Sequence, residues 1–171
     1  MTFCDIKPHY ESPPPPDCDI WDRLWFSLLM NLFPSSDGYI IRPRRRFPPK
    51  SALIMEVLKI LPPYTYPSRT LLFIEIRNTS HWQPGIRKQE KRLKKIIDAA
   101  FAGNGPSTAR SKVYWISVIG PHWRFGYKDD DGEDLAPLIE WHHTTHDQDS
   151  YQDFQDLAGL VEVGFFSKFY H

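Results

Sequence analysis

Residues 71 to 77 read Leu-Leu-Phe-Ile-Glu-Ile-Arg, a run of large apolar side chains that ends in an acid, an apolar residue and a base. A Pro-rich segment precedes this run and a polar segment follows it. Such a pattern is typical of a buried strand, which we predict from Thr70 to Arg77. Because alternate side chains of a strand share a face, Glu75 and Arg77 are expected to project to the same side.

The neighbouring segments predict the partners of this strand. Ala52 to Leu61 is a second apolar run, separated from the first by a loop with three prolines. Pro84 can occupy the first turn of a helix, and an apolar stripe then continues as far as Phe101. Lys112 to Ile119 is a further predicted strand. Residues 52 to 119 therefore predict a strand hairpin, a basic helix and a strand, which form the core of an α/β domain.

Further elements are expected on both sides of this unit. Trp21, Leu24, Trp25, Leu28, Leu29 and Leu32 recur at helical spacing after Asp17 or Asp19, either of which can cap a helix that Pro34 ends. A short strand at Tyr39–Ile41 follows, and the Arg-Pro-rich stretch from Arg42 to Lys50 is expected to be irregular. Later strands are predicted at Trp123–Tyr127 and around Leu138–Trp141. Asp149 or Ser150 is expected to cap a last helix.

The length of 171 residues predicts one domain, from residue 17 to residue 171, after a Pro-rich arm at residues 1 to 16. There is no apolar run near eighteen residues and no charged-then-apolar leader, so we expect no membrane association and a cytoplasmic or nuclear location. Cys4 and Cys18 do not form a pattern of spaced pairs. We therefore expect reduced cysteines and neither a disulfide framework nor a cysteine zinc site.

The formal net charge of zero hides an uneven distribution. Residues 42 to 95 hold fourteen basic and three acidic residues, whereas the segments on either side are acidic. A folded domain with these cations on one face would attract DNA or RNA. The residues expected to bind nucleic acid are Arg42, Arg44, Arg45, Arg46, Arg87, Lys88, Lys91, Lys94 and Lys95, with Trp82 as a stacking residue. The alternative is that the three segments neutralise one another in the fold.

The order helix, strand, strand, helix, strand resembles the nuclease superfamily with the PD-(D/E)XK motif, over roughly residues 19 to 163. Leu71 to Arg77 looks like its second hairpin strand, with Glu75 at the acid position and Arg77 at the lysine position. The chain also resembles uncharacterised fungal proteins with a Val-Glu-Ile-Lys strand. Their counterparts here are residues 73–77, the helix around Gln89 and residues 113–120. The resemblance implies a restriction-endonuclease-like fold with a central mixed sheet flanked by helices.

The resemblance also implies a Mg²⁺ site for phosphodiester hydrolysis, with Glu75 as one metal ligand. Two departures bear on activity. Arg77 stays protonated and cannot act as a base, and no acid occupies the family's aspartate position near Ser51. Glu56 is a candidate second ligand, since a symmetric hairpin would place it opposite Glu75. The alternative is that Glu56 forms a closed ion pair with Arg77 or another arginine. Asp22 is a weaker third acid.

Two other groups of residues are candidate sites. His142 and His146 would bind zinc if they lay one helical turn apart, although the surrounding segment also reads as a polar loop. Exposed aromatic residues near the basic helix would stack on unpaired bases, the candidates being Tyr64, Tyr66, Trp82, Trp123 and Phe125.

Together these observations predict a degenerate PD-(D/E)XK nuclease-like domain that binds nucleic acid and is catalytically weak or inactive, with Glu75, Arg77 and Glu56 at the ancestral catalytic site. One alternative is an active Mg²⁺-dependent nuclease that uses Glu56 and Glu75. The other is a protein-interaction module that acts without nucleic acid through the Pro-rich arm and the acidic C-terminal region.

Overall fold

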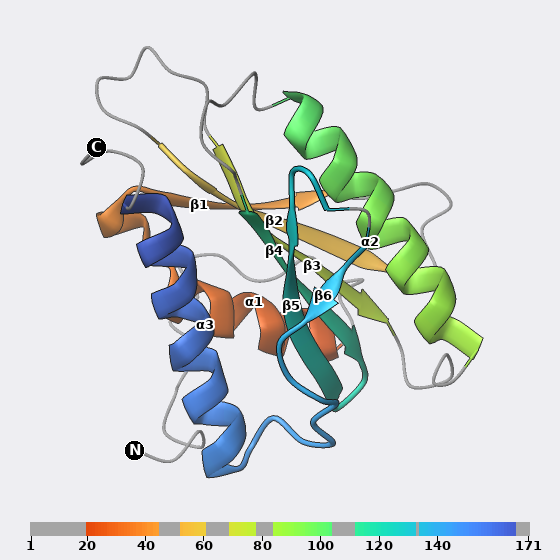
Figure 1. The fold of residues 1–171 in the computed structure, drawn as a ribbon. Coiled ribbons are helices and arrows are strands. Elements are labelled where there is room, and N and C mark those ends of the chain that lie inside the picture. Colours follow the sequence, from red (N-terminus) through yellow and green to blue (C-terminus); the bar gives the residue numbers. More distant parts are fainter. Residues whose placement is uncertain are drawn as a thin grey trace.

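The strand with Glu75 and Arg77 lies inside a six-stranded mixed sheet with helices on both faces (Figure 1). The structure is a computed structural model that describes residues 20–44, 52–60, 69–77, 84–103, 112–132 and 134–166. The predicted arm at residues 1–16 and the predicted caps Asp17 and Asp19 lie outside these ranges. The elements are α1 (Ile20–Leu32), η2 (Ser35–Asp37), β1 (Tyr39–Arg44), β2 (Leu53–Lys59), β3 (Arg69–Arg77), α2 (Pro84–Gly103), β4 (Lys112–Ile119), β5 (His122–Asp129), β6 (Ala136–Pro137) and α3 (Gln148–Phe166).

The strands follow one another in the sheet in chain order, from β1 to β6. β3 and β4 are parallel and the other neighbouring pairs are antiparallel. A parallel pair needs a long crossover connection, and α2 lies within it. The predicted hairpin, helix and strand are therefore confirmed, as is the α/β class with a mixed sheet and flanking helices.

The two faces of the sheet carry separate apolar cores because the buried side chains alternate along the central strands. On one face, α1 and α3 cover even-numbered residues of β3 and β4 such as Leu72, Ile74 and Ile116. The opposite face is covered by α2 (Figure 1). There Leu93 packs with Phe73 and other apolar side chains. Glu75 and Arg77 have the same parity as Phe73, so they lie on the face that α2 covers.

Three details of the predicted elements were wrong. β1 continues through Arg42 to Arg44 rather than ending at Ile41, because an edge strand tolerates Pro43. The strand expected around Leu138–Trp141 is replaced by β6 two residues earlier. The backbone of β6 passes so close to Gly126 that a Cβ there would lie 2.1 Å from the Ala136 carbonyl oxygen. Only glycine permits this pairing.

The cap of α3 was the third incorrect detail. Asp147, rather than Asp149 or Ser150, accepts a hydrogen bond from the Ser150 backbone N–H at 2.8 Å, which satisfies one of the free donors of the first turn. Hydrogen bonds from Ser150 lower the pKa of Asp147, which keeps the capping carboxylate ionised.

Trp123 and Phe125 belong to the core and do not stack on nucleic acid. Trp123 is 0% exposed and Phe125 is 2% exposed. The Trp123 ring stacks on Phe154 at 4.0 Å between centroids, and its indole N–H donates to the Thr144 carbonyl oxygen at 2.9 Å. The alternation of β5 turns both rings toward α3, so the prediction that they contact bases was wrong. Tyr64, Tyr66 and Trp82 lie outside the described residues.

Candidate functional site

The three candidate catalytic residues lie on the same face of the sheet, beneath α2. Glu75 and Arg77 occupy alternate positions of β3, as the sequence predicted, and Glu56 lies on the neighbouring strand β2. Both glutamates are 0% exposed, and Arg77 is 5% exposed. Burial at this depth means that each charge needs a partner of opposite charge inside the protein.

Glu56 does not pair with Glu75 across the hairpin. Its partner on β3 is Phe73, while Glu75 is paired with Ile54. The expected register assumed a symmetric hairpin, but Thr70 pairs with Leu58 and the register shifts at a bulge between Val57 and Leu58. The offset of two residues keeps both carboxylates on one face and separates them diagonally along the strands.

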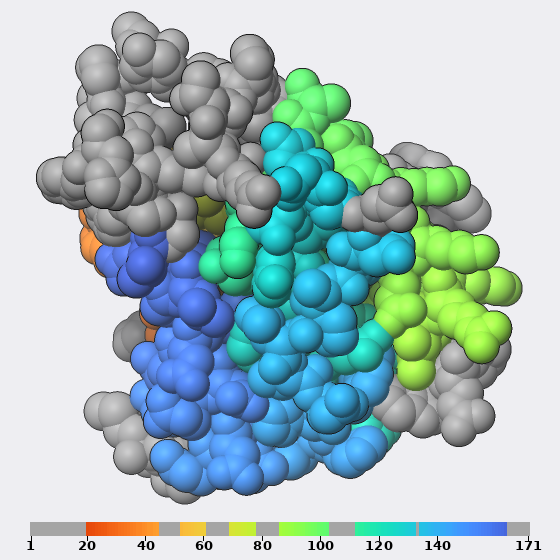
Figure 2. Space-filling model, in the orientation of Figure 1, coloured from red at the N-terminus to blue at the C-terminus, as the bar shows by residue number. Residues whose placement is uncertain are grey.

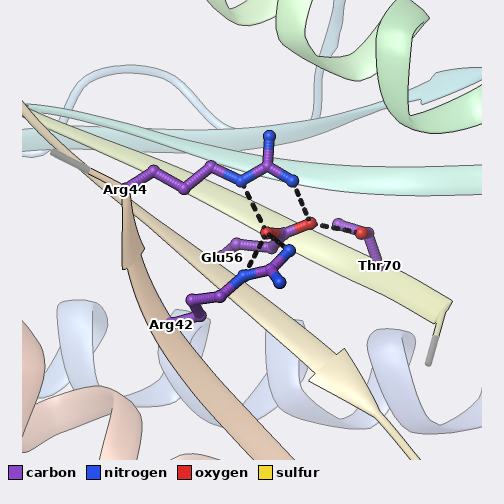
Figure 3. Close-up of polar contacts among 4 residues, drawn as sticks. All are labelled: Arg42, Arg44, Glu56 and Thr70. Atoms are coloured by element: carbon purple, nitrogen blue, oxygen red, sulfur yellow. Dashed lines mark hydrogen bonds and ion pairs between the residues drawn. The ribbon is translucent and has the colours of Figure 1, made fainter. Parts of the chain in front are cut away.

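Glu56 is held by residues of two flanking strands (Figure 3). From β1, Arg42 donates to Glu56 Oε2 at 2.6 Å through Nη2, and Arg44 donates to it at 2.7 Å through Nε. From β3, the Thr70 hydroxyl donates to Oε1. The bulge makes this last contact possible. Because Leu71 has no partner on β2, Thr70 faces the same side of the sheet as Glu56. Two arginines and a hydroxyl thus surround the carboxylate.

A second cluster surrounds Glu75. Arg77 Nε donates to Glu75 Oε1 at 2.9 Å, and Arg92 from α2 reaches the same oxygen at 3.3 Å. Gln89, one turn before Arg92 on α2, donates through Nε2 to the carbonyl oxygens of Glu75 at 2.7 Å and Val118 at 3.2 Å. Ser117 lies beside Glu75 on β4. The sequence showed no link between Glu75 and Arg92, because only the packing of α2 brings them together.

The donor set around the two glutamates fits closed ion pairs better than a divalent cation. Mg²⁺ would need carboxylate oxygens that converge on a shared position. Here each carboxylate has two arginines as neighbours, and the hairpin register keeps the two glutamates apart. Within the ranges that the structure describes, no three His, Cys, Asp or Glu side chains gather as a metal-binding group.

The basic helix carries most of the described cations predicted to bind nucleic acid. Its buried stripe faces the sheet, and the exposed side of α2 forms one flank of the molecule (Figure 2). Arg87, Lys88, Lys91 and Lys95 are exposed, and none of them has an ion pair with another described residue. Lys94 instead pairs with Asp98 at 3.7 Å. We call the first four residues the α2 basic face.

The remaining predicted contacts divide into two groups. Arg44 lies on the same face of the sheet as α2, but Glu56 neutralises part of its charge. Arg45, Arg46 and Trp82 lie outside the described residues. The described part of the predicted surface is therefore the α2 basic face, with β1 supplying arginines already bound to a carboxylate.

His142 and His146 do not form the predicted metal pair, because they lie in the connection before α3 and not one turn apart on a helix. His142 contacts Asp153 at 2.6 Å through Nε2 and Ser150 Oγ at 3.3 Å through Nδ1. This arrangement resembles a serine triad in composition alone. Ser150 is 0% exposed, and its hydroxyl donates to the Thr144 carbonyl oxygen at 2.8 Å, so it has no access to a substrate.

No family model, curated protein or solved structure matches this chain. Among the described residues, no helix is long and apolar enough to cross a membrane.

The ion pairs of Glu56 predict a pH dependence of stability. Burial alone raises its pKa, but hydrogen bonds from Thr70, Arg42 and Arg44 outweigh burial and hold the pKa below the ordinary value of 4.5. The ionised form is therefore favoured in the folded protein. Its contribution to stability is present above the unfolded pKa and is lost as the pH falls through the folded pKa.

Glu56→Gln should accordingly flatten the dependence of the free energy of unfolding on pH below about pH 4.5. Urea denaturation between pH 3 and pH 7, values chosen to bracket roughly that transition, measures this effect. The exposed Asp134→Asn serves as a control for loss of a carboxylate elsewhere. Equal acid sensitivity in Glu56→Gln and the parent chain would contradict the assignment.

Proposed function

We propose that this chain is a degenerate nuclease-like domain that binds nucleic acid through the α2 basic face and does not cleave it. The observation that carries the proposal is that the charges on the buried side of α2 are neutralised, whereas the cations on its exposed side are not. On the buried side, arginines neutralise Glu56 and Glu75. On the exposed side, Arg87, Lys88, Lys91 and Lys95 project to solvent without an acidic partner among the described residues.

The buried side supports the loss of catalysis. Hydrolysis of a phosphodiester requires a metal or a base that activates water, and an arginine such as Arg77 is not suited to act as that base. Arg77 and Arg92 both reach Oε1 of Glu75. Within the described residues, the buried Ser117 Oγ and Gln89 Oε1 have no hydrogen-bond partner. Unsatisfied buried polar atoms of this kind are uncommon, and they support descent from a functional polar site.

The exposed side supports binding to a polyanion. Arg87, Lys91 and Lys95 follow one another at intervals of four residues, so they share one side of α2 and form a row about 12 Å long. Phosphate groups repeat along each strand of a duplex at about 3.4 Å of axis, and such a row can therefore contact several of them. Contacts of this type are insensitive to base sequence.

The proposal predicts nucleic-acid binding that weakens steeply with salt. Simultaneous Arg87→Gln, Lys88→Gln, Lys91→Gln and Lys95→Gln should lower the slope of log affinity against log salt by about 3–4, since each lost phosphate contact removes about one unit. Fluorescence anisotropy with labelled single-stranded DNA, duplex DNA and RNA measures the slope and identifies the preferred polymer. Circular dichroism confirms that the variant is folded.

Arg23→Gln with Lys112→Gln is a control, because both residues are exposed cations outside α2. This control variant should keep most of the affinity. Absent binding, binding independent of salt, or an unchanged slope in the quadruple variant would reject the proposed interface. Cleavage by the parent chain with Mg²⁺ or Mn²⁺ would reject the loss of catalysis and favour the active-nuclease alternative.

A further inference from the structure

The connection between β6 and α3 brings two histidines together at the surface. Trp123 and His142 form an antiparallel bridge in which the Trp123 N–H donates to the His142 carbonyl oxygen at 3.1 Å and the His142 N–H donates back at 2.8 Å. One step beyond this hydrogen-bonded pair, His122 and His143 lie opposite each other. Side chains approach more closely at such a position than at a hydrogen-bonded pair.

The Nδ1 atoms of His122 and His143 lie next to each other. The two Nδ1 atoms are 3.0 Å apart, and the rings lie edge to face with centroids 5.1 Å apart. With metal–nitrogen distances of about 2.0–2.1 Å, two ligand nitrogens are about 2.9 Å apart when the nitrogen–metal–nitrogen angle is a right angle. At the tetrahedral angle they are about 3.3 Å apart. The observed separation lies between these values.

We infer that His122 and His143 form a two-histidine site for a transition-metal ion such as Cu²⁺ or Zn²⁺. Neutral imidazole is a good ligand for both ions, and Cu²⁺ binds more tightly at a given site of this kind. In the described part of the chain no third His, Cys, Asp or Glu joins the pair. The two imidazoles would supply two of the coordination positions of the ion.

The surroundings of the pair support this inference. His143 is exposed and His122 is half-buried, so the pair is accessible from solvent. Arg124, two residues along β5 on the same face, is paired with Glu90 from α2. The positive charge of Arg124 near the histidine pair is therefore neutralised by Glu90.

The test uses the full chain without a polyhistidine tag. Titration calorimetry with Zn²⁺ measures affinity, and electron paramagnetic resonance of the Cu²⁺-loaded chain reports how many nitrogens bind the ion. His122→Asn and His143→Asn should each weaken the binding at least about tenfold, since even loss of an outer-shell partner costs about 10–100-fold. Zn²⁺ should also raise the Tm of the parent chain and of neither variant.

His146→Asn is the matched control, because His146 is an exposed histidine of the same connection. Its affinity for Zn²⁺ should equal that of the parent chain, and its Cu²⁺ spectrum should retain the signature of two imidazoles. Absence of binding by the parent chain would overturn the inference. Unchanged affinity in both His122→Asn and His143→Asn would do so as well, because the ion would then be held elsewhere.

Discussion

Glu75→Gln should lower the free energy of unfolding by about 3–5 kcal/mol, the usual cost of removing one partner of a buried ion pair. The glutamate is 0% exposed and Arg77 is 5% exposed, so the neutral amide would leave a guanidinium buried without its carboxylate. Urea denaturation at pH 7 measures the loss.

The double variant Glu75→Gln with Arg77→Met should recover part of this stability, because it removes the unpaired charge as well. Glu90→Gln is a matched control, since Glu90 and its partner Arg124 are both more exposed than the buried pair. A loss below about 1 kcal/mol for Glu75→Gln would place the pair among ordinary surface ion pairs and contradict the closed cluster.

This result bears directly on function. Replacing a residue that acts in catalysis is expected to lower activity. Replacing Glu75 is instead expected to lower stability. The cluster of Glu75, Arg77 and Arg92 joins β3 to α2. We therefore attribute to Glu75 a structural role, which is to fix the helix that presents the α2 basic face.

Trp123→Ala should also lower the free energy of unfolding by about 3–5 kcal/mol, as expected for truncation of a fully buried aromatic side chain. The indole stacks on Phe154 and on His142, and it donates a hydrogen bond to the Thr144 carbonyl oxygen. Its removal would leave a cavity between β5 and α3. Equilibrium denaturation measures the loss.

Trp123→Phe should cost less, because it retains the stacking and loses only the hydrogen bond and part of the volume. Any nucleic-acid affinity measured for the parent chain should be unchanged in this milder variant under conditions in which it is folded. Loss of affinity in folded Trp123→Phe would restore a role for Trp123 in base stacking and would contradict its placement in the core.

The central elements could be predicted because their local signals agreed. β4 has the predicted bounds, Lys112 to Ile119, and β3 begins one residue before Thr70. In both strands the apolar composition, the flanking breakers and the length point to the same structure. α2 begins at Pro84 as predicted, because the apolar stripe and the missing amide N–H both favour a helix start there.

The register of the hairpin could not be predicted in the same way. A single extra residue at Leu71 changes the pairing, and a bulge has no distinctive composition in a strand of uniformly apolar residues. The strand around Leu138 failed for a related reason. Its real position depends on the close approach of the Ala136 backbone to Gly126, which is a contact between strands and not a property of either segment.

The sequence by itself determined the α/β class, the strand with Glu75 and Arg77 on one face, and the concentration of cations on α2. These features depend on periodicity and composition, which are local properties of the chain. Only the tertiary structure decided which charges remain exposed. The buried carboxylate of Glu56 is paired with Arg42 and Arg44 of β1, and that of Glu75 with Arg92 of α2. Such pairing is needed because burial makes an unpaired charge costly. The cluster around Glu56 and Glu75 is closed for that reason, and the α2 basic face remains exposed.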